Sequence, residues 1–232
     1  MRRDLYVLDL DGMQQSAVDL TDPTRLVFDY TRRIGDIIDR IPPGPSRVLH
    51  VGGAAMTLAR YVHATRPRSS QIVLEPSAEL VEKVRAEAPL PPRSGIKVRP
   101  FDGMSGIRGV RDGYADVVIL DAFDGARTPG ELTSAAFVED VRRVLAPSGV
   151  FVANLVDRAP FARVRDFVAV ARELGSLAIG VEPATMKGRR PGNLVVACGA
   201  VPGEPFGTPS PMEYRIFTDR AVDDSFGGGV KA

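Results

Sequence analysis

Apolar runs of strand length alternate with helix-like patterns along most of this chain. The patterns predict strands at 47–51, 71–75, 96–100, 116–120, 149–154, 177–182 and 193–198, and helices at 56–66, 77–87, 131–146 and 160–174. Regular alternation of this kind is typical of a parallel sheet that carries helices on both faces. We therefore expect an α/β fold, Rossmann-like and doubly wound, with a mostly parallel seven-stranded sheet.

The two ends of this pattern differ from its centre. Only the turn 187–192 separates the last two predicted strands, so they should pair antiparallel as a terminal hairpin. Before the sheet, two strand-like runs about Asp11-Gly12 predict a small β-hairpin, and apolar spacing predicts a helix over about 24–40. We divide the chain into 1–44, a hairpin and helix lid; 45–200, the α/β domain; and 201–232, a Pro/Gly-rich extension expected to be only partly ordered.

Composition excludes several classes of function. With 30 basic and 29 acidic residues the net charge is +1, which gives no case for nucleic acid or an anionic membrane as partner. No apolar run is long enough to span a bilayer and no signal-type segment follows Met1, so we expect a cytoplasmic protein. His50 and His63 lack further ligands at metal-binding spacing, so no metal is predicted.

The first predicted strand of the sheet ends in the glycine pair Gly52-Gly53, and the second ends at Glu75. Backbone amides at such a turn, with an acid about twenty residues later for ribose hydroxyls, are how a doubly wound domain holds a nucleoside. The turn lacks a full G-x-G-x-x-G, so alone it also fits an ordinary strand-to-helix turn. Glu75 alone also fits a surface acid that caps a helix.

Two further loops follow predicted strands at the same edge of the sheet. Asp102-Gly103 could bind an adenine amino group, or Asp102 could cap the short segment that follows. Asp121 stands at the tip of a buried strand, and Asp124 comes three residues later. Two acids at a pocket mouth suit a cationic substrate or a base that takes a proton from an amine, although a solvent-facing acid pair is the alternative.

These motifs together resemble the spermidine synthase family of polyamine aminopropyltransferases, within the class I S-adenosylmethionine-dependent methyltransferase-like superfamily. The resemblance covers about residues 5–198. VLDLDGMQQ at 7–15 looks like the family's VLDGxxQ, and FDY at 28–30 looks like FxYxE. VLHVGG at 48–53 is similar to the start of VLxIGGGDG, and DAFD at 121–124 stands where the family has DSSDP.

The resemblance implies a role for each matching residue. Asp121 would be the catalytic base, Tyr30 would orient the attacking amine, and Asp124 would attract a cationic substrate. The nucleoside would be held by Gln15, Gly52, Gly53, Glu75, Asp102 and Gly103. The implied co-substrate is S-adenosylmethionine or its decarboxylated form, the acceptor is an amine or another small molecule, and a homodimer is the expected assembly.

The chain also departs from the family pattern. Ala55 stands where the family has an aspartate that faces the ammonium of a decarboxylated donor. The family's acid after the tyrosine is also missing, since Thr31-Arg32-Arg33 follows Tyr30. The leading hypothesis is a spermidine synthase-like transferase that binds S-adenosylmethionine, its decarboxylated form or methylthioadenosine, with aminopropyl transfer to an amine. The alternatives are an S-adenosylmethionine-dependent methyltransferase and a non-catalytic relative whose pocket is blocked by Phe123, Met56 or the 187–190 turn.

Overall fold

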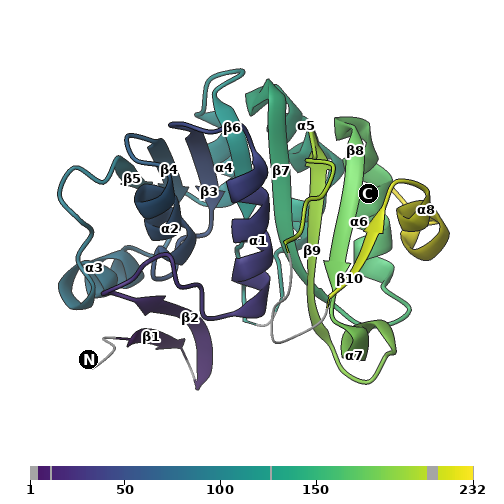
Figure 1. Ribbon diagram of the computed structural model, residues 1–232, viewed down its shortest axis with the longest axis horizontal. Coiled ribbons are helices and arrows are strands. Elements are labelled where there is room, and N and C mark those ends of the chain that lie inside the picture. Colours follow the sequence, from purple (N-terminus) through teal and green to yellow (C-terminus); the bar gives the residue numbers. More distant parts are fainter. Residues whose placement is uncertain (1–4, 11, 126, 208–213, 232) are drawn as a thin grey trace.

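A mixed sheet of eight strands forms the centre of the molecule (Figure 1). The computed structural model describes residues 5–10, 12–125, 127–207 and 214–231. The strand order is β10-β8-β9-β7-β6-β3-β4-β5. The strands are β3 (Arg47–Val51), β4 (Ser70–Leu74), β5 (Ile96–Arg99), β6 (Ala115–Leu120), β7 (Leu145–Asp157), β8 (Ser176–Val181), β9 (Gly192–Gly199) and β10 (Arg215–Thr218).

The sheet changes direction between its two halves. Strands β5, β4, β3, β6 and β7 run parallel to one another, whereas β9, β8 and β10 pair antiparallel. The predicted α/β class and the antiparallel pairing of the last two predicted strands are therefore confirmed. Strand order reverses between β3 and β6, which is where ligands bind in open α/β sheets.

Helices cover both faces of the sheet. They are α1 (Asp29–Arg40), α2 (Thr57–Thr65), α3 (Ala78–Glu87), α4 (Gly103–Arg108), α5 (Ala135–Val144), α6 (Ala162–Ala171), α7 (Pro183–Met186) and α8 (Arg220–Phe226). Two short 3-10 helices lie at Gly130–Thr133 and Arg172–Leu174. Helix α1 begins at Asp29, five residues later than predicted. None of the helices among the described residues is long and apolar enough to cross a membrane.

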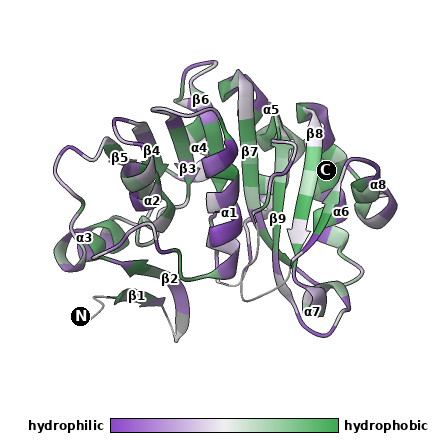
Figure 2. Cartoon of the chain, viewed as in Figure 1, coloured by the Kyte–Doolittle hydropathy of each residue, from purple (hydrophilic) through white to green (hydrophobic). Residues whose placement is uncertain are grey.

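Alternating side chains of the strands fill two layers of core. On β3, Val48 belongs to the core that includes the isoleucines of α1 and residues of α2, whereas Leu49 belongs to the core on the opposite face that includes residues of α4, α5 and α6. The neighbouring strands repeat this alternation, and Figure 2 shows the hydrophobic colour concentrated on the sheet. Because period-two side chains point to opposite faces, continuous apolar runs in the sequence mark strands that are buried on both sides.

The N-terminal hairpin lies against the ends of α2 and α3 (Figure 1). Its strands β1 (Leu5–Leu10) and β2 (Met13–Asp19) pair antiparallel, as predicted, although Asp11 of the predicted turn lies outside the described residues. Leu8 and Val18 pack on Ala55 in a small apolar cluster. Since a two-stranded hairpin is marginal alone, this contact explains why the segment is ordered on the domain.

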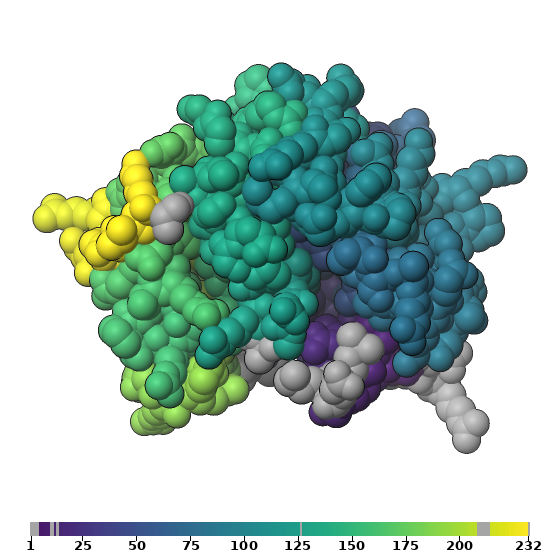
Figure 3. Space-filling view, turned by 180° about the vertical axis from the view of Figure 1, so that it is seen from behind, coloured from purple at the N-terminus to yellow at the C-terminus, as the bar shows by residue number. Residues whose placement is uncertain are grey.

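The C-terminal segment differs from expectation, because it adds the eighth strand and a helix. Strand β10 pairs with β8, and α8 buries Val222 and Phe226 completely. Phe226 meets the ring of Phe217 at a centroid distance of 5.2 Å. Figure 3 shows these yellow residues packed beside the green residues of the sheet domain. A strand of four residues after a Pro/Gly-rich stretch has little signal of its own, and its stability comes from pairing with β8.

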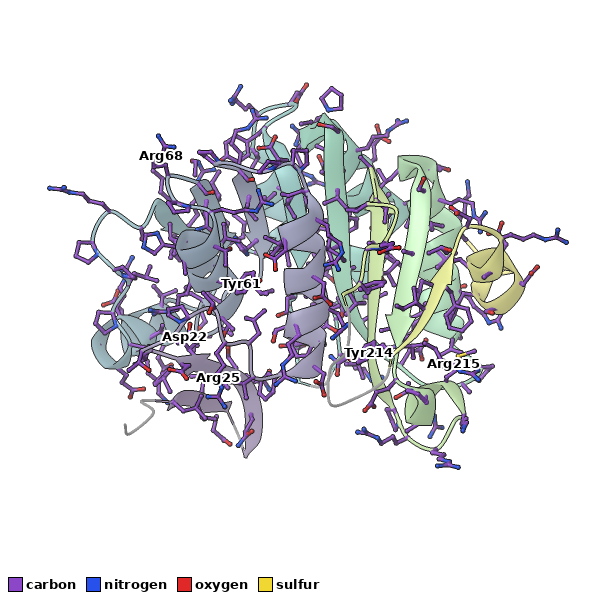
Figure 4. All side chains as sticks on the ribbon, in the orientation of Figure 1. Asp22, Arg25, Tyr61, Arg68, Tyr214 and Arg215 are labelled. Atoms are coloured by element: carbon purple, nitrogen blue, oxygen red, sulfur yellow. The ribbon has the colours of Figure 1, made fainter. Side chains whose placement is uncertain are left out.

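The residue just before β10 also contacts helix α1. The ring of Tyr214, labelled in Figure 4, lies 5.4 Å from the guanidinium carbon of Arg33 on α1. Arg33 is buried and also donates to the carbonyl of Gly207 and pairs with Asp36. The segment after residue 200 is thus held on the domain at α1 and at β8.

Candidate functional site

A cavity of about 620 Å³ opens at the carboxyl ends of β3, β4 and β6. Such a volume suits a ligand of nucleoside size. Figure 3 shows the hairpin (purple), the segments around β4 and α3 (blue) and the loop after β6 (teal) meeting on one face. The residues to which the resemblance gave a role all line this cavity: Gln15, Tyr30, Gly52, Gly53, Glu75, Asp102, Gly103, Asp121 and Asp124. Their roles stay predictions.

The glycine turn after β3 brings the first loop close to the loop after β6. Gly52 has φ of +95°, and a Cβ at this position would collide with the backbone carbonyl of Asp121. Two non-glycine residues of the turn also have left-handed backbone, Ala54 with φ of +42° and Met56 with φ of +61°. Since this region disfavours side chains, the turn is held by its surroundings rather than by local preference.

Glu75 is one of those surroundings. Its Oε2 accepts hydrogen bonds from the backbone amides of Gly53 at 3.1 Å and Ala54 at 3.3 Å, and its Oε1 accepts from the amide of Ser77 at 3.0 Å. The side chain is buried. The carboxylate therefore joins the end of β4 to the glycine turn and to the start of α3, in addition to facing the cavity.

Asp102 is the N-cap of α4. Its carboxylate accepts from the Ser105 amide at 2.8 Å and also from the Ser105 hydroxyl, and these bonds hold the pKa of Asp102 below its ordinary value. The capping alternative considered for this residue is thus present in the structure. Asp102 also borders the cavity beside Gly103, whose missing side chain makes room for Leu132 and Val51.

Asp121 and Tyr30 form a hydrogen-bonded pair in which both pKa values lie above their ordinary values. The Tyr30 hydroxyl and the Asn154 amide both donate to the Asp121 carboxylate, the latter at 2.9 Å. Burial raises the pKa of Asp121 to about 6, although both hydrogen bonds oppose this rise. Burial and the nearby Asp121 charge raise the pKa of Tyr30, which therefore stays protonated as a donor. A carboxylate with this pKa is suited to accept a proton near neutral pH.

Acidic side chains dominate the lining of the cavity. Besides Asp121, they are Glu75, Glu79, Asp102, Asp124 and Glu131, whereas Lys83 is the single lysine or arginine among the described lining residues. Asp124 is exposed at the mouth, and its backbone pairs with Arg127. Fixed charges of one sign around a cleft favour ligands of the opposite charge, so the site suits a cation.

The arginines after Tyr30 do not reach this cavity. Arg32 donates to the carbonyls of Leu26 and Val27 and to Asp29, and Arg33 contacts the C-terminal segment instead. Thr31 lines the cavity and donates to the carbonyl of Phe28. The arginines therefore add no positive charge to the cavity lining.

Ala55 lies away from the cavity. It is fully buried beneath Leu8 and Val18 of the hairpin and does not contribute to the lining. Phe123 and Met56, considered as blocking residues, line the cavity without filling it. Arg190 of the 187–190 turn forms two hydrogen bonds with Glu182, at 2.7 and 2.8 Å.

His50 lines the cavity as a neutral side chain. Burial lowers its pKa to about 4, and its Nε2 is 2.9 Å from Oε1 of Gln71. The amide of Gln71 donates to the Ala59 carbonyl, so its oxygen faces the imidazole and Nε2 carries the hydrogen. No group of three or more His, Cys, Asp or Glu that could hold a metal occurs among the residues the structure describes.

Sequence reasoning assigned no role to Asn154, which supports Asp121. A polar amide inside the apolar run 150–155 was the available signal, because buried polar side chains need partners. The side chain is completely buried.

No protein-family model matches the chain. A polyamine aminopropyltransferase of Chromobacterium violaceum is 30% identical over 141 residues, covering 60% of this chain and 53% of that protein. The chain thus spans about half the length of this curated relative. A probable spermidine synthase of Corynebacterium glutamicum has a similar crystal structure, with a TM-score of 0.88 at 28% identity over 99% of this chain and 88% of that one.

A third similarity concerns the fold alone. The structure of human methyltransferase-like protein 13 in complex with SAH gives a TM-score of 0.60 at 22% identity, covering 78% of this chain and 85% of that one. The same sheet and helix arrangement is thus shared by proteins named for aminopropyl transfer and for methyl transfer.

Proposed function

Because the chain is a distant relative of the spermidine synthase (polyamine aminopropyltransferase) family, we propose that it is a transferase that moves an alkyl group from an adenosyl sulfonium donor to a small amine. The observation that carries this proposal is the Tyr30–Asp121 pair at an acid-lined cavity of about 620 Å³. A cavity of this size accommodates the nucleoside, and its acids attract both a sulfonium and an ammonium.

The reaction requires the protein to position the donor and the acceptor and to accept one proton. Asp121 takes a proton from the acceptor ammonium, and the freed nitrogen lone pair attacks the carbon beside the sulfonium sulfur. The new C–N bond forms as the C–S bond breaks, and the sulfur leaves as a neutral thioether. With aminopropyl transfer this product is methylthioadenosine. Since Asp121 has a pKa of about 6, it is ionised and able to accept the proton above that pH.

The donor nucleoside would lie along the glycine turn. The carboxylate of Glu75 faces the cavity at the end of β4 and supplies acceptors for ribose hydroxyls, and Asp102-Gly103 borders the adenine end. Gln15 on β2 closes the cavity from the hairpin side. Glu75, Asp102-Gly103 and Gln15 therefore support binding of the nucleoside part of the donor. They do not distinguish between the groups that its sulfur can carry.

Methyl transfer from S-adenosylmethionine is the second candidate. The observation that favours it is that the described lining from the hairpin and from α2 carries no acid that would repel a donor carboxylate, since Ala55 is buried under the hairpin. Nearby lining groups from the hairpin and α2 are the neutral polar side chains of Gln15, Ser16 and Thr57. Under this alternative the acceptor still meets Asp121.

Calorimetric titration with S-adenosylmethionine, its decarboxylated form and methylthioadenosine separates the candidates. Preference for the decarboxylated donor supports aminopropyl transfer, which a product assay with putrescine then checks. Preference for the carboxylated donor supports methyl transfer. Failure of all three to bind contradicts both candidates and favours a non-catalytic relative. Asp121→Asn should leave nucleoside affinity within about threefold and remove turnover, because the base is lost while the nucleoside contacts remain.

A further inference from the structure

Two asparagine side chains lie in series behind Asp121. Leu120 of β6 pairs with Ala153 of β7. The residues that follow them, Asp121 and Asn154, therefore lie side by side at the carboxyl end of β6. Its Nδ2 donates to Oδ1 of Asp121 at 2.9 Å. On the next strand, Nδ2 of Asn193 donates to Oδ1 of Asn154 at 2.8 Å. The three side chains thus form one continuous chain of hydrogen bonds across β6, β7 and β9.

The chemistry of these groups permits only one direction for the chain. An ionised carboxylate accepts and does not donate, so the amide of Asn154 must present its NH₂ to Asp121. Its carbonyl oxygen then faces Asn193, which must present its own NH₂ in turn. Neither asparagine lines the cavity, so both act on the site only through Asp121.

We propose that Asn193 is a positioning residue for Asp121, because it fixes the amide orientation of Asn154 and thereby the donor that holds one carboxylate oxygen of Asp121. The proposal rests on the proposed role of Asp121 as the base. Asn154 is completely buried and Asn193 is partly buried, so the Asn154 oxygen depends mainly on Asn193 for its hydrogen bond. Without Asn193, only the ionised carboxylate orients the Asn154 amide. On protonation of Asp121 the amide is then free to turn and accept from the carboxyl proton, which favours the protonated form and raises the pKa of Asp121.

Other groups that share the cavity with Asp121 act independently of this chain. Tyr30 donates from α1, and His50 from β3 is neutral because burial lowers its pKa to about 4. Glu75, which follows β4, is held by backbone amides, and Asp124 is exposed in the loop that follows β6. A change at Asn193 alters none of these contacts directly.

The test measures the pKa of Asp121 in the ligand-free protein, by NMR of a chain labelled at the aspartate carboxyl carbons. Asp121→Asn identifies the resonance. Asn193→Ala removes the donor, and Asn193→Asp places a carboxylate against Oδ1 of Asn154, which forces the amide to turn over. We expect the pKa of Asp121 to rise in both variants, by about one unit, or tenfold in its acid dissociation constant, in Asn193→Asp.

Thr128→Val is the matched control, because Thr128 donates to the backbone carbonyl of Asn154 and not to its amide. It should leave the pKa of Asp121 within about 0.2 unit. A merely structural role for Asn193 would lower the melting temperature of its variants and leave this pKa unchanged. An unchanged pKa in folded Asn193→Ala and Asn193→Asp proteins would overturn the proposal, and either variant suffices if the other does not fold.

This readout is separate from transfer activity. If the pKa rises as expected and the wild-type protein transfers no group, the positioning of Asp121 by Asn193 stands and the proposed function fails. If transfer is observed and the pKa does not move, the proposed function stands and the role of Asn193 is refuted. Where transfer is measurable, the acidic limb of its pH profile should shift upward in the Asn193 variants by the same amount as the NMR pKa.

Discussion

Replacing Asp121 by asparagine should stabilise the folded protein at neutral pH. Burial raises the pKa of this carboxyl from 3.8 to about 6, so between these values the folded protein binds more protons than the unfolded chain. The free energy of unfolding therefore falls as pH rises through this window, and the loss is complete above the folded pKa. A rise of the pKa from 3.8 to about 6 corresponds to about 3 kcal/mol. Because asparagine carries no charge, the Asp121→Asn protein does not lose this free energy of unfolding as the pH rises.

The assay is urea denaturation of both proteins from pH 4 to pH 7.5. The variant should match the wild type near pH 4 and exceed it by up to about 3 kcal/mol at pH 7.5, with unchanged denaturant dependence. Asp124→Asn, which removes an exposed carboxyl from the same loop, controls for the loss of one negative charge and should show no such pH-dependent gain. A difference that does not grow with pH, or a variant less stable than the wild type at pH 7.5, would show that the buried charge of Asp121 does not destabilise the fold.

Three further substitutions test other contacts, two of them with a matched control variant. Glu75→Gln should weaken methylthioadenosine binding at least about tenfold in calorimetry, because the charge-assisted bonds to the glycine turn are lost. Glu79→Gln, which changes another acid of the cavity lining, should alter the affinity less than about twofold. Equal effects of the two variants would contradict the anchoring role of Glu75. Gly52→Ala should lower the free energy of unfolding by about 3 kcal/mol or more, since its Cβ would collide with backbone at a left-handed φ. Gly53→Ala should lower it clearly less, because a Cβ there comes no closer than 3.0 Å to side-chain atoms. Phe226→Ala should cost about 3–5 kcal/mol, and a loss below about 1 kcal/mol would show that α8 is not part of the core.

Much of the fold follows from local pattern. The predicted strand 47–51 coincides with β3, and 71–75 and 116–120 lie within one residue of β4 and β6. These runs are apolar without alternation because both faces are covered, and helical spacing between them leaves few other topologies. Strand β10 escaped prediction because four residues pair only once β8 is in place, and α1 starts at Asp29 rather than near residue 24.

The site was predictable to the extent that it depends on strand ends. Parallel strands end at a shared edge, so Gly52, Glu75 and Asp121 had to approach one another once the sheet formed. Their distances and partners were not available from the spacing. The spacing also left open which way Arg32 and Arg33 point, and α1 turns both away from the cavity.

Side-chain period and chain order were enough to predict the α/β class, seven strands and the four longer helices of the sheet domain, and the residues that meet at the carboxyl ends of its strands. The surroundings of each residue could be seen only in the folded molecule. The tertiary structure placed Ala55 beneath the hairpin, gave Glu75 the amides of the glycine turn, and put Asn154 and Asn193 behind Asp121. Burial and hydrogen bonding set the pKa of a carboxyl, and both arise from residues distant in sequence that the packed fold brings together.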